Sequence, residues 1–393
     1  MHRKITADYV CPVSSAPIAE GVVITDASGE IIEIGTRDQF DATELEIFKG
    51  IIVPGFINTH CHLELSHMLG KCPTGVGLIP FISHVITQRD STYEQIQYSI
   101  QQAEQQMLDC GIVAVGDISN TTDSFAQKQK GNLHYYTFVE YFDLFQEANT
   151  AKETEKYDAV FNTLQESATH KKSKVPHAPY SVSPQLFEQL KDNVGTKTIS
   201  IHNQETLAEN QLFEKKSGGF MDFYQRLNLD TSGIPDIRRT SIHYALQYLQ
   251  KCHRTLFVHN TLTTKEDIET AQDLLGKENV FWATCPNANL YIENQLPLYQ
   301  HFLDMHAQVT IGTDSLTSNW QLNILEEMKT ILKFQSYLDF PTVLSWATIN
   351  GAKALGFDQH LGSIEKGKKP GLVLLEHIEN WKLSRATSAK RII

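Results

Sequence analysis

The sequence predicts an α/β fold: a closed (β/α)8 TIM barrel that carries a small β-sandwich domain formed from both chain ends. Three observations support this prediction. Eight short apolar runs recur between residues 51 and 315, stretches of helical composition separate them, and β-rich runs with turn signals flank the whole series. Strands that alternate with helices pair in parallel, and eight such units are the number that closes a barrel.

The small β-domain is predicted from residues 1–54 and 347–393 together. Apolar runs at 21–25 and 30–35 flank Asp-Ala-Ser-Gly at 26–29, a pattern typical of a β-hairpin. The C-terminal end shows the same alternation of apolar run and turn, with GLVLLEHI at 371–378 after a Gly- and Lys-rich turn region. Each end alone is too short to bury a core, so we expect the two ends to fold as one domain.

The barrel is assigned to residues 55–346, with its first strand starting in the apolar run just before. The eight expected strands lie at 51–58, 111–119, 134–142, 174–181, 196–203, 255–260, 279–287 and 307–315. Helices are expected between them, for example at 91–109 and 264–277. The second of these begins with Thr264, followed three residues later by Asp267, which is a helix-start signal.

The longest interruption of the barrel pattern runs from residue 203 to 254. It carries aromatic residues such as Phe220, Phe223 and Tyr224. Two interpretations remain open, an insertion that contacts substrate and an extra helix pair packed outside the barrel.

Composition excludes several classes of function. The formal net charge of −12 argues against nucleic acid as the main partner, because phosphate binding needs concentrated Lys and Arg. No run approaches the roughly 20 apolar residues that span a membrane, and the first residues lack the apolar stretch of a signal peptide. Six cysteines without paired spacing indicate a reduced protein, so we expect a cytoplasmic enzyme for a small molecule.

Candidate metal ligands follow several predicted strands. His60 and His62 stand at the end of the first strand, where residues two apart point to the same face. His202 ends the fifth strand and Asp314 the eighth, and His259 ends the sixth. These ends meet at the barrel face that holds active sites, and the nitrogen and oxygen set suits one Zn²⁺ ion, with Fe²⁺ as the alternative, and leaves a position for water.

The chain resembles the metal-dependent amidohydrolase superfamily, in the branch of adenosine-type, guanine and triazine-ring deaminases and chlorohydrolases. The matching motifs are PGFINTHCHLELS, HAPYSVS, IHNQET, FVHN, CPNAN, IGTDSLTSN and LGSIEKGKKPGLVLL, in order along almost the whole chain. The resemblance implies that His60, His62, His202 and Asp314 bind one metal. It also implies a homodimer.

The resemblance also implies the catalytic roles. Glu205 would shuttle a proton to the ring nitrogen, His259 would orient the hydroxide, and His177 would contact the substrate. Glu64 is expected either to hydrogen-bond the substrate or to accept from a nearby backbone N–H. A divalent metal lowers the pKa of its water from about 15.7 to about 7, and two carboxylates, Asp314 and Glu205, suit the proton transfers of deamination. Asp314 would be both ligand and first proton acceptor.

A single metal is expected, because no lysine ends the fourth strand where its carbamate could bridge two ions. Lys174 is the nearest and lies too far down that strand. Two departures from the usual family wording are Gly371, where relatives usually have Asp, and Ala288, where Ser is common. The second makes a polar contact at that position doubtful.

HLELS together with GTDSLTSN is most similar to the aminodeoxyfutalosine deaminases, which are adenine-ring deaminases. The expected reaction is attack of a metal-bound hydroxide on an amino-substituted purine, giving the oxo product and ammonia. Deamination of another adenine nucleoside, of guanine or of cytosine stays open, as does hydrolytic dechlorination of a triazine. Hydrolysis of a cyclic amide and a metal-free scaffold are the alternatives from other classes.

Overall fold

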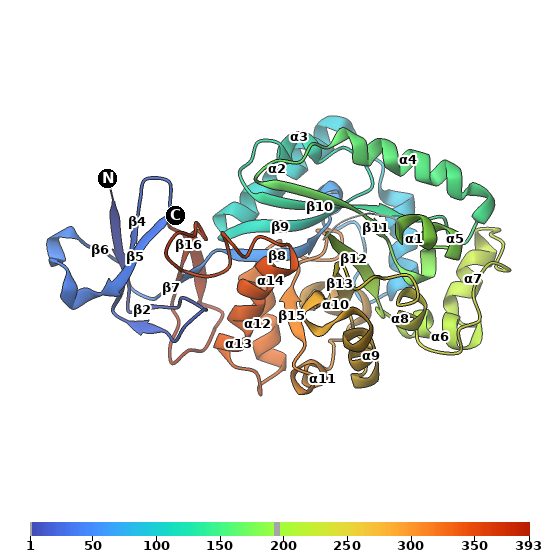
Figure 1. The fold of residues 1–393 in the computed structure, drawn as a ribbon. Helices are drawn as coiled ribbons and strands as arrows, with labels where there is room; N and C mark the ends of the chain where they lie inside the picture. The colour runs from blue at the N-terminus through green and yellow to red at the C-terminus, as the bar shows by residue number, and fades with distance from the viewer. Residues whose placement is uncertain (1, 192–196) are drawn as a thin grey trace.

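The computed structural model describes residues 2–191 and 197–393, and Figure 1 shows the barrel with the small domain at one side. Eight strands in chain order make the barrel. They are β8 (Phe56–Cys61), β9 (Ile112–Ser119), β10 (His134–Tyr141), β11 (His170–Pro176), β12 (Thr198–Asn203), β13 (Arg254–His259), β14 (Val280–Thr284) and β15 (Gln308–Ile311). Residue 196, the first of the expected fifth strand, lies outside the described residues.

All neighbouring barrel strands run in parallel. β8 to β11 form one ladder and β12 to β15 form the other. Backbone hydrogen bonds close both seams: His202 N donates to the carbonyl of His177, and Thr313 N and Asp314 N both donate to the carbonyl of His60, each over 3.0 Å. The predicted closed barrel is confirmed, and the carboxyl ends of its strands meet at one mouth.

Helices cover the outside of the barrel (Figure 1). They are α1 (Leu78–Gln88), α2 (Tyr93–Asp109), α3 (Phe125–Lys128), α4 (Thr150–Thr163), α5 (Pro184–Lys191), α9 (Lys265–Leu275), α10 (Pro286–Glu293), α11 (Tyr299–Asp304), α12 (Ile324–Phe334), α13 (Phe340–Ala347) and α14 (Ile349–Ala354). Both expected helices are confirmed as α2 and α9. The start of α9 is a capping box, in which Thr264 accepts from Asp267 N and the Asp267 carboxylate accepts from Thr264 N.

Residues 203–254 form three helices at the mouth: α6 (Leu207–Lys215), α7 (Gly219–Arg226) and α8 (Ile242–Ala245). The ring of Phe213 in α6 stacks on Tyr244 in α8 with centroids 5.1 Å apart. The Tyr224 hydroxyl of α7 donates to the carbonyl of Tyr180, which follows β11. This segment therefore packs against the mouth of the barrel.

The two chain ends build the small domain together, as predicted. One sheet has the order β5-β4-β1-β6 and the other β17-β16-β7-β2-β3. Their strands are β1 (Arg3–Thr6), β2 (Tyr9–Val10), β3 (Ile18–Ala19), β4 (Gly21–Thr25), β5 (Ile31–Thr36), β6 (Glu46–Ile47), β7 (Ile51–Pro54), β16 (Leu372–Glu376) and β17 (Ser388–Arg391). Ile5 and Val23 of the first sheet share a buried cluster with Ile52 and Leu374 of the second.

The expected hairpin is present as antiparallel β4 and β5. Its turn is stabilised by Asp26, whose carboxylate accepts from the backbone N–H groups of Ser28 and Glu30 over 2.8 and 2.9 Å. Such an Asx turn explains why an aspartate opens this connection.

Two expected strands differ from the structure. The run 51–58 is broken at Gly55 into β7 of the small domain and β8 of the barrel, where a Cβ would lie 2.6 Å from the carbonyl of Pro370. The fourth strand starts at His170 and ends at Pro176, four residues earlier than expected at its start. The lysines of this segment do not follow the hydrophobic pattern of a buried strand. In the structure they point away from the barrel interior: Lys172 donates to the carbonyl of Phe161 and Lys174 to the carboxylate of Asp158.

The division of the chain at residues 54 and 346 stays a prediction. Helix α14, which follows the second boundary, packs on the barrel: a Cβ on Gly351 would lie 2.8 Å from Cβ of Ile57 in β8. Ala352 and Leu355 share a buried cluster with Ile57 and Leu256 at the closed end of the barrel.

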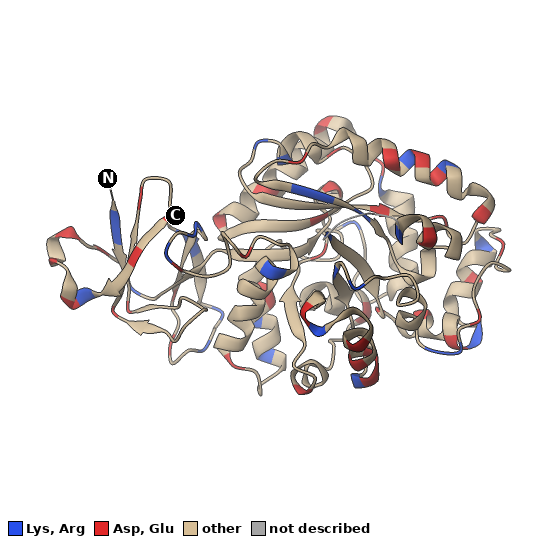
Figure 2. Ribbon diagram, in the orientation of Figure 1, with Lys and Arg blue, Asp and Glu red and all other residues tan. Residues whose placement is uncertain are grey.

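Charged residues lie mainly on the outer surfaces. In the view of Figure 2, Lys and Arg are spread over the outer helices and the small domain rather than gathered in one place. None of the described helices is long and apolar enough to cross a membrane.

One ion pair is fully buried next to β8. Lys128 and Asp117 both have 0% exposed side chains, and the Lys128 ammonium binds the Asp117 carboxylate and donates to Ser119 Oγ over 2.9 Å. The other carboxylate oxygen of Asp117 accepts from Leu63 N over 2.8 Å. The pair therefore fixes the backbone immediately after His62.

Replacing Lys128 by methionine should destabilise the protein by about 3–5 kcal/mol, because it leaves the Asp117 charge buried without its partner. Chemical denaturation measures the loss. Lys265 forms an exposed pair with Asp304, so Lys265→Met is the matched control and should cost less than about 1 kcal/mol. Equal losses in the two variants would contradict a special role for the buried pair, whereas adding Asp117→Asn to Lys128→Met should recover part of the stability.

Candidate active site

A cavity of about 240 Å³ opens at the mouth of the barrel. Its polar lining contains most of the residues that the sequence singled out. These are His62, Glu64, His177, His202, Glu205, His259, Asp314 and Ser315. The other predicted ligand, His60, is completely buried directly beneath them.

The four predicted ligands converge. Nε2 of His60 lies 3.1 Å from Nε2 of His62, and these nitrogens lie 3.5 and 3.3 Å from Oδ1 of Asp314. The ring of His202 is 4.9 Å from that of His60, centroid to centroid. Ligand atoms of His60, His62 and His202 all lie within 4.8 Å of one another, as do those of His60, His259 and Asp314. This is a His/Asp group with the dimensions of a metal-binding site.

The charge state of the group fits a divalent cation. Burial lowers the pKa of His60 to about 3 and that of His62 well below its ordinary value, so both imidazoles are neutral. Burial alone would raise the pKa of Asp314, but the facing imidazoles, His60 first, hold it well below its usual range. Two neutral imidazole nitrogens and a carboxylate that face one another present lone pairs to a common point, which a cation satisfies.

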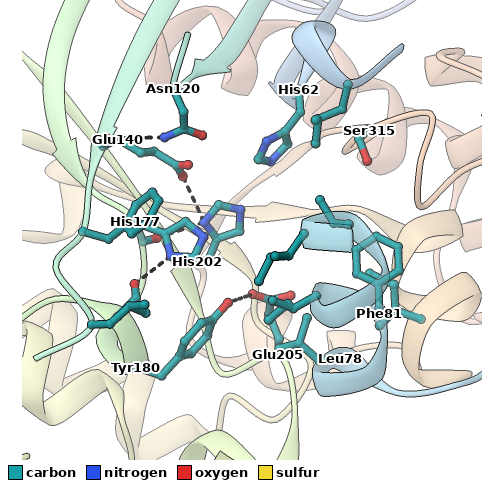
Figure 3. Close-up of a pocket in the computed structure, with 18 of the residues that line it drawn as sticks. His62, Leu78, Phe81, Asn120, Glu140, His177, Tyr180, His202, Glu205 and Ser315 are labelled. Atoms are coloured by element: carbon teal, nitrogen blue, oxygen red, sulfur yellow. Dashed lines mark hydrogen bonds and ion pairs between the residues drawn. The ribbon is translucent and has the colours of Figure 1, made fainter. Parts of the chain in front are cut away.

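His202 is oriented by partners on its far side. Its Nδ1 donates to the carbonyl of His177 over 2.9 Å and lies 3.2 Å from Oε1 of Glu140 (Figure 3). Although burial alone would lower it, the facing Glu140 carboxylate raises the pKa of His202 to about 10, so a metal at Nε2 would displace a proton while Nδ1 keeps its partners, as in carboxylate–histidine–metal sites. Glu140 is buried at the end of β10 and lines the same cavity.

Asp314 lies in the left-handed region of backbone conformation, with φ of 58°. Its Oδ2 accepts from the Ser318 hydroxyl over 2.6 Å, which leaves Oδ1 directed at the histidines. A non-glycine residue at positive φ is retained only where its surroundings fix it, and such residues gather at functional sites. Ser318 thus braces this carboxylate.

His259 and Glu205 lie next to each other beside the other side chains of the His/Asp group. Nδ1 of His259 donates to Oδ1 of Asn289 over 2.8 Å, and its Nε2 lies 3.6 Å from Oε2 of Glu205. The Tyr180 hydroxyl donates to Oε1 of Glu205 over 3.3 Å, as Figure 3 shows. A carboxylate and an imidazole nitrogen therefore face the same part of the cavity.

The backbone at Glu205 is held by a second buried carboxylate. Glu209 accepts from Gln204 N and from Glu205 N over 2.9 and 3.0 Å. Burial raises the pKa of Glu209 to about 7. Gln204 has φ of 48°, so this carboxylate fixes a strained turn that directs Glu205 into the cavity.

His177 and Glu64, the two remaining predicted substrate contacts, differ in how many of their polar atoms already form hydrogen bonds. His177 lines the cavity while its Nδ1 is hydrogen bonded to Ser181 Oγ over 2.7 Å, so its other nitrogen is available. Glu64 also lines the cavity, but its carboxylate accepts from Arg89 Nη2, Asn120 N, Thr121 N and the Thr121 hydroxyl over 2.9–3.0 Å. The backbone-accepting interpretation of Glu64 describes what the structure contains, and its contact with substrate stays a prediction.

The outer part of the cavity is apolar. Helices α1 and α7 face each other across it and touch, since a Cβ on Gly219 would lie 2.7 Å from Cδ1 of Ile79. Their lining side chains are Leu78, Phe81, Ile82, Val85 and Ile86 from α1, and Phe220, Phe223, Tyr224 and Leu227 from α7 and its end. The insertion at 203–254 therefore contributes a wall of the cavity through α7, while Arg238 and Arg239 are exposed and paired with Asp236 and Glu266.

Several polar or reactive residues near the strand ends have structural rather than cavity-lining positions. Cys61 and Cys285 are buried and outside the cavity lining. Asn287 donates from its backbone and side chain to the carboxylate of Glu327, over 2.8 and 2.9 Å. Ala288 is buried and makes no polar side-chain contact.

Sequence reasoning missed Glu140 and Tyr180. Glu140 is a lone acidic residue near the end of the expected third strand, so the rule that found His202 and Asp314 would have found it too. Tyr180 lies in a 3₁₀ turn, η5 (Pro179–Ser181), that follows β11, and no periodicity reveals its contact with Glu205.

Comparison with known proteins agrees with this geometry. Residues 51–389 match the amidohydrolase family. The chain is 27% identical over 380 residues to adenosine deaminase of Helicobacter pylori, covering 93% of this chain and 89% of the relative. It is 26% identical over 341 residues to aminodeoxyfutalosine deaminase of a Nitratiruptor species, covering 84% and 79%.

A solved structure shares the fold. The crystal structure of Helicobacter pylori aminofutalosine deaminase in complex with methylthio-coformycin has a TM-score of 0.82 at 24% identity and covers 100% of both chains. The expectation of an enzyme that acts on carbon–nitrogen bonds agrees with the names of these relatives. Because the family match spans most of its length, the chain belongs to the amidohydrolase family.

Proposed function

We propose that this enzyme is a zinc-dependent deaminase that converts an adenine-type nucleoside, such as aminodeoxyfutalosine, into the oxo product and ammonia. The observation that carries the proposal is the position of Glu205 and His259 beside the His/Asp group in one cavity. The names of the two sequence relatives, both deaminases, support the substrate class.

His60, His62, His202 and Asp314 would hold the metal, and their nitrogen and oxygen donors favour Zn²⁺, with Fe²⁺ as the alternative. When bound, the ion supplies a water nucleophile at neutral pH by lowering its pKa to about 7. The lysines of β11 all point elsewhere: Lys171 donates to the carbonyl of Gly356, while Lys172 and Lys174 point outward. This supports a site for a single ion.

Asp314 and Glu205 would carry out the proton transfers of the reaction. Asp314 would accept the first proton of the attacking water, with its carboxylate held in orientation by the Ser318 hydroxyl at Oδ2. Glu205 donates a proton to the ring nitrogen next to the reacting carbon, which makes that carbon electrophilic. After attack, Glu205 would regain a proton from the attacking oxygen, and the proton held by Asp314 would pass to the amino group, so ammonia leaves as the carbon–nitrogen bond breaks and the ring keeps the oxo group.

His259 and His177 position the reacting atoms. The hydrogen bond from His259 Nδ1 to Asn289 fixes the ring so that Nε2 faces Glu205 and the cavity. His177 is fixed in the same way by Ser181 and offers its second nitrogen to the substrate. Burial lowers the pKa of His177 well below its ordinary value, so it serves as a neutral hydrogen-bonding group rather than as a cation. A homodimer, which the family resemblance implies, stays a prediction.

The direct test is a screen for ammonia release by the zinc-loaded protein. Adenosine, 5′-deoxyadenosine and aminodeoxyfutalosine should each yield ammonia and shift the ultraviolet band to shorter wavelength, because the amino group becomes an oxo group. Guanine, cytosine, a chlorotriazine and a cyclic amide serve as competing substrates. Turnover confined to one of these competitors would refute the proposal.

Glu205→Gln should lower kcat about 10²–10⁴-fold, the usual contribution of a general acid–base, while metal content stays at the parent value. The amide keeps the shape of the side chain but cannot transfer the proton. Glu214→Gln, in the same segment but outside the cavity lining, is the matched control and should keep full activity. An active Glu205→Gln enzyme would rule out the proton-transfer role.

His60→Ala should reduce the metal content itself, since it removes a completely buried donor of the group. Elemental analysis after dialysis measures the metal-to-protein ratio, and His360→Ala, an exposed histidine far from the site, provides the reference. An unchanged ratio in His60→Ala would show that His60 is not a ligand.

A further inference from the structure

The two turns that carry Glu205 and His259 have unusual backbone conformations. Gln204, directly before Glu205, has φ of 48°, while His259 and the following Asn260 have φ of 71° and 57°. Non-glycine residues keep this left-handed conformation only where their surroundings hold them in it. The strands that lead into the two turns, β12 and β13, pair in parallel up to their last residues. The turns therefore lie side by side at the barrel mouth.

The side chain of Gln204 joins these two turns. Its Oε1 accepts from the Thr263 hydroxyl over 2.6 Å, and its Nε2 donates to Oδ2 of Asp267 over 3.2 Å. Thr263 follows His259 by four residues, and Asp267 lies in the first turn of α9. All three side chains of this contact are buried. A single amide therefore ties the turn before Glu205 to the segment after His259.

Backbone hydrogen bonds reinforce this link. The carbonyl of Gln204 accepts from Leu262 N over 3.1 Å, and the carbonyl of Asn203 accepts from Asn260 N over 3.0 Å. The side chains of the two asparagines also meet, since Asn203 Nδ2 donates to Oδ1 of Asn260 over 3.0 Å. The backbone N–H of Gln204 donates to Glu209, so Gln204 is bonded through its N–H, its carbonyl and both atoms of its amide. The two turns form one connected unit.

Gln204 itself does not reach the reacting atoms. It lies outside the cavity lining, whereas Glu205 and His259 both line the cavity. Oε2 of Glu205 lies 3.6 Å from Nε2 of His259, and the relative position of the two turns sets this distance. Catalysis depends steeply on such distances, because a misplacement of about 1 Å can cost about 10²-fold in rate. A contact that joins the turns therefore acts on the reaction through the side chains they carry.

We propose that Gln204 is a positioning residue, whose side-chain amide fixes the separation of Glu205 and His259 by joining their two turns. This inference rests on the proposed deaminase function, in which Glu205 transfers a proton and His259 positions the reacting atoms. A glutamine suits the role because one amide offers an acceptor to Thr263 and a donor to Asp267 at the same time.

Gln204→Asn is the direct test. Asparagine keeps the amide and tolerates the left-handed backbone, but it is one methylene too short to bond both partners. The variant should lower kcat about 10- to 100-fold for the adenine nucleoside that the parent enzyme deaminates best, while KM and metal content stay at the parent values. Thr263→Val removes the hydroxyl that donates to the amide, and it should lower kcat in the same way if Gln204→Asn folds poorly.

A second background separates positioning from a general loss of structure. In Glu205→Gln the proton transfer that Gln204 serves is already absent, so adding Gln204→Asn should lower the residual kcat by no more than about 2-fold, the usual scatter of additive effects. A purely structural defect would instead lower kcat by the same factor in both backgrounds. Equal factors would therefore overturn the proposal.

Gln127→Asn is the matched control. Gln127 is a buried glutamine of α3 outside the cavity lining, and its amide likewise joins two partners, donating to Glu104 and accepting from Lys130. This control should lose stability in chemical denaturation as Gln204→Asn does, yet keep the parent kcat.

Two results would overturn the assignment while the deaminase function stands: a Gln204→Asn enzyme with the parent kcat, or a Gln127→Asn enzyme that loses as much kcat as Gln204→Asn. A parent enzyme that releases ammonia from no adenine nucleoside would instead refute the proposed function, and this inference with it.

Discussion

The structure depends on one arrangement, the convergence of three histidines and an aspartate from strands far apart in the chain on a single point at the barrel mouth. Nε2 of His60 and Nε2 of His62 lie 3.1 Å apart and face Oδ1 of Asp314, so nitrogen and oxygen donors that suit a metal ion are directed at one point. The surrounding backbone maintains this arrangement. Both seams of the barrel close through residues of the group, since His202 N bonds to residue 177 and Asp314 N bonds to the carbonyl of His60.

Each reactive side chain is fixed at the end that faces away from the cavity. Glu140 and a carbonyl hold His202, Asn289 holds His259, and Ser318 holds Asp314. These outer contacts set which nitrogen carries the proton and which oxygen is free. The proton transfers proposed for these groups would therefore need little reorganisation when substrate arrives, which is how enzymes lower the cost of reaction.

The sequence predicted the barrel and most residues of the His/Asp group, and the features that it missed have physical explanations. Strand–helix alternation predicted the closed barrel, and the rule that functional residues follow parallel strands brought His60, His62, His202, His259 and Asp314 together. The start of the fourth strand was misplaced because alternate residues there are lysines that point outward. The hydrophobic pattern therefore did not indicate a strand over these residues.

Contacts between loops could not be predicted from the sequence. The saturation of Glu64 by Arg89, Asn120 and Thr121 depends on three segments that meet only after folding. The apolar wall from α1 could be seen as an amphipathic helix, but nothing in its pattern shows that it faces a cavity rather than a core.

The chain crosses from the small domain into the barrel through a single residue, Gly55, between β7 and β8. β7 pairs with β16, which the ribosome makes far later, and β8 carries His60. The upstream end of β8, the strand that carries His60, therefore gains its full tether only when nearly the entire polypeptide has been synthesised. Nascent chains that still lack β16 would hold His60 less firmly, so the His/Asp group should reach its final geometry late in biogenesis rather than barrel strand by barrel strand.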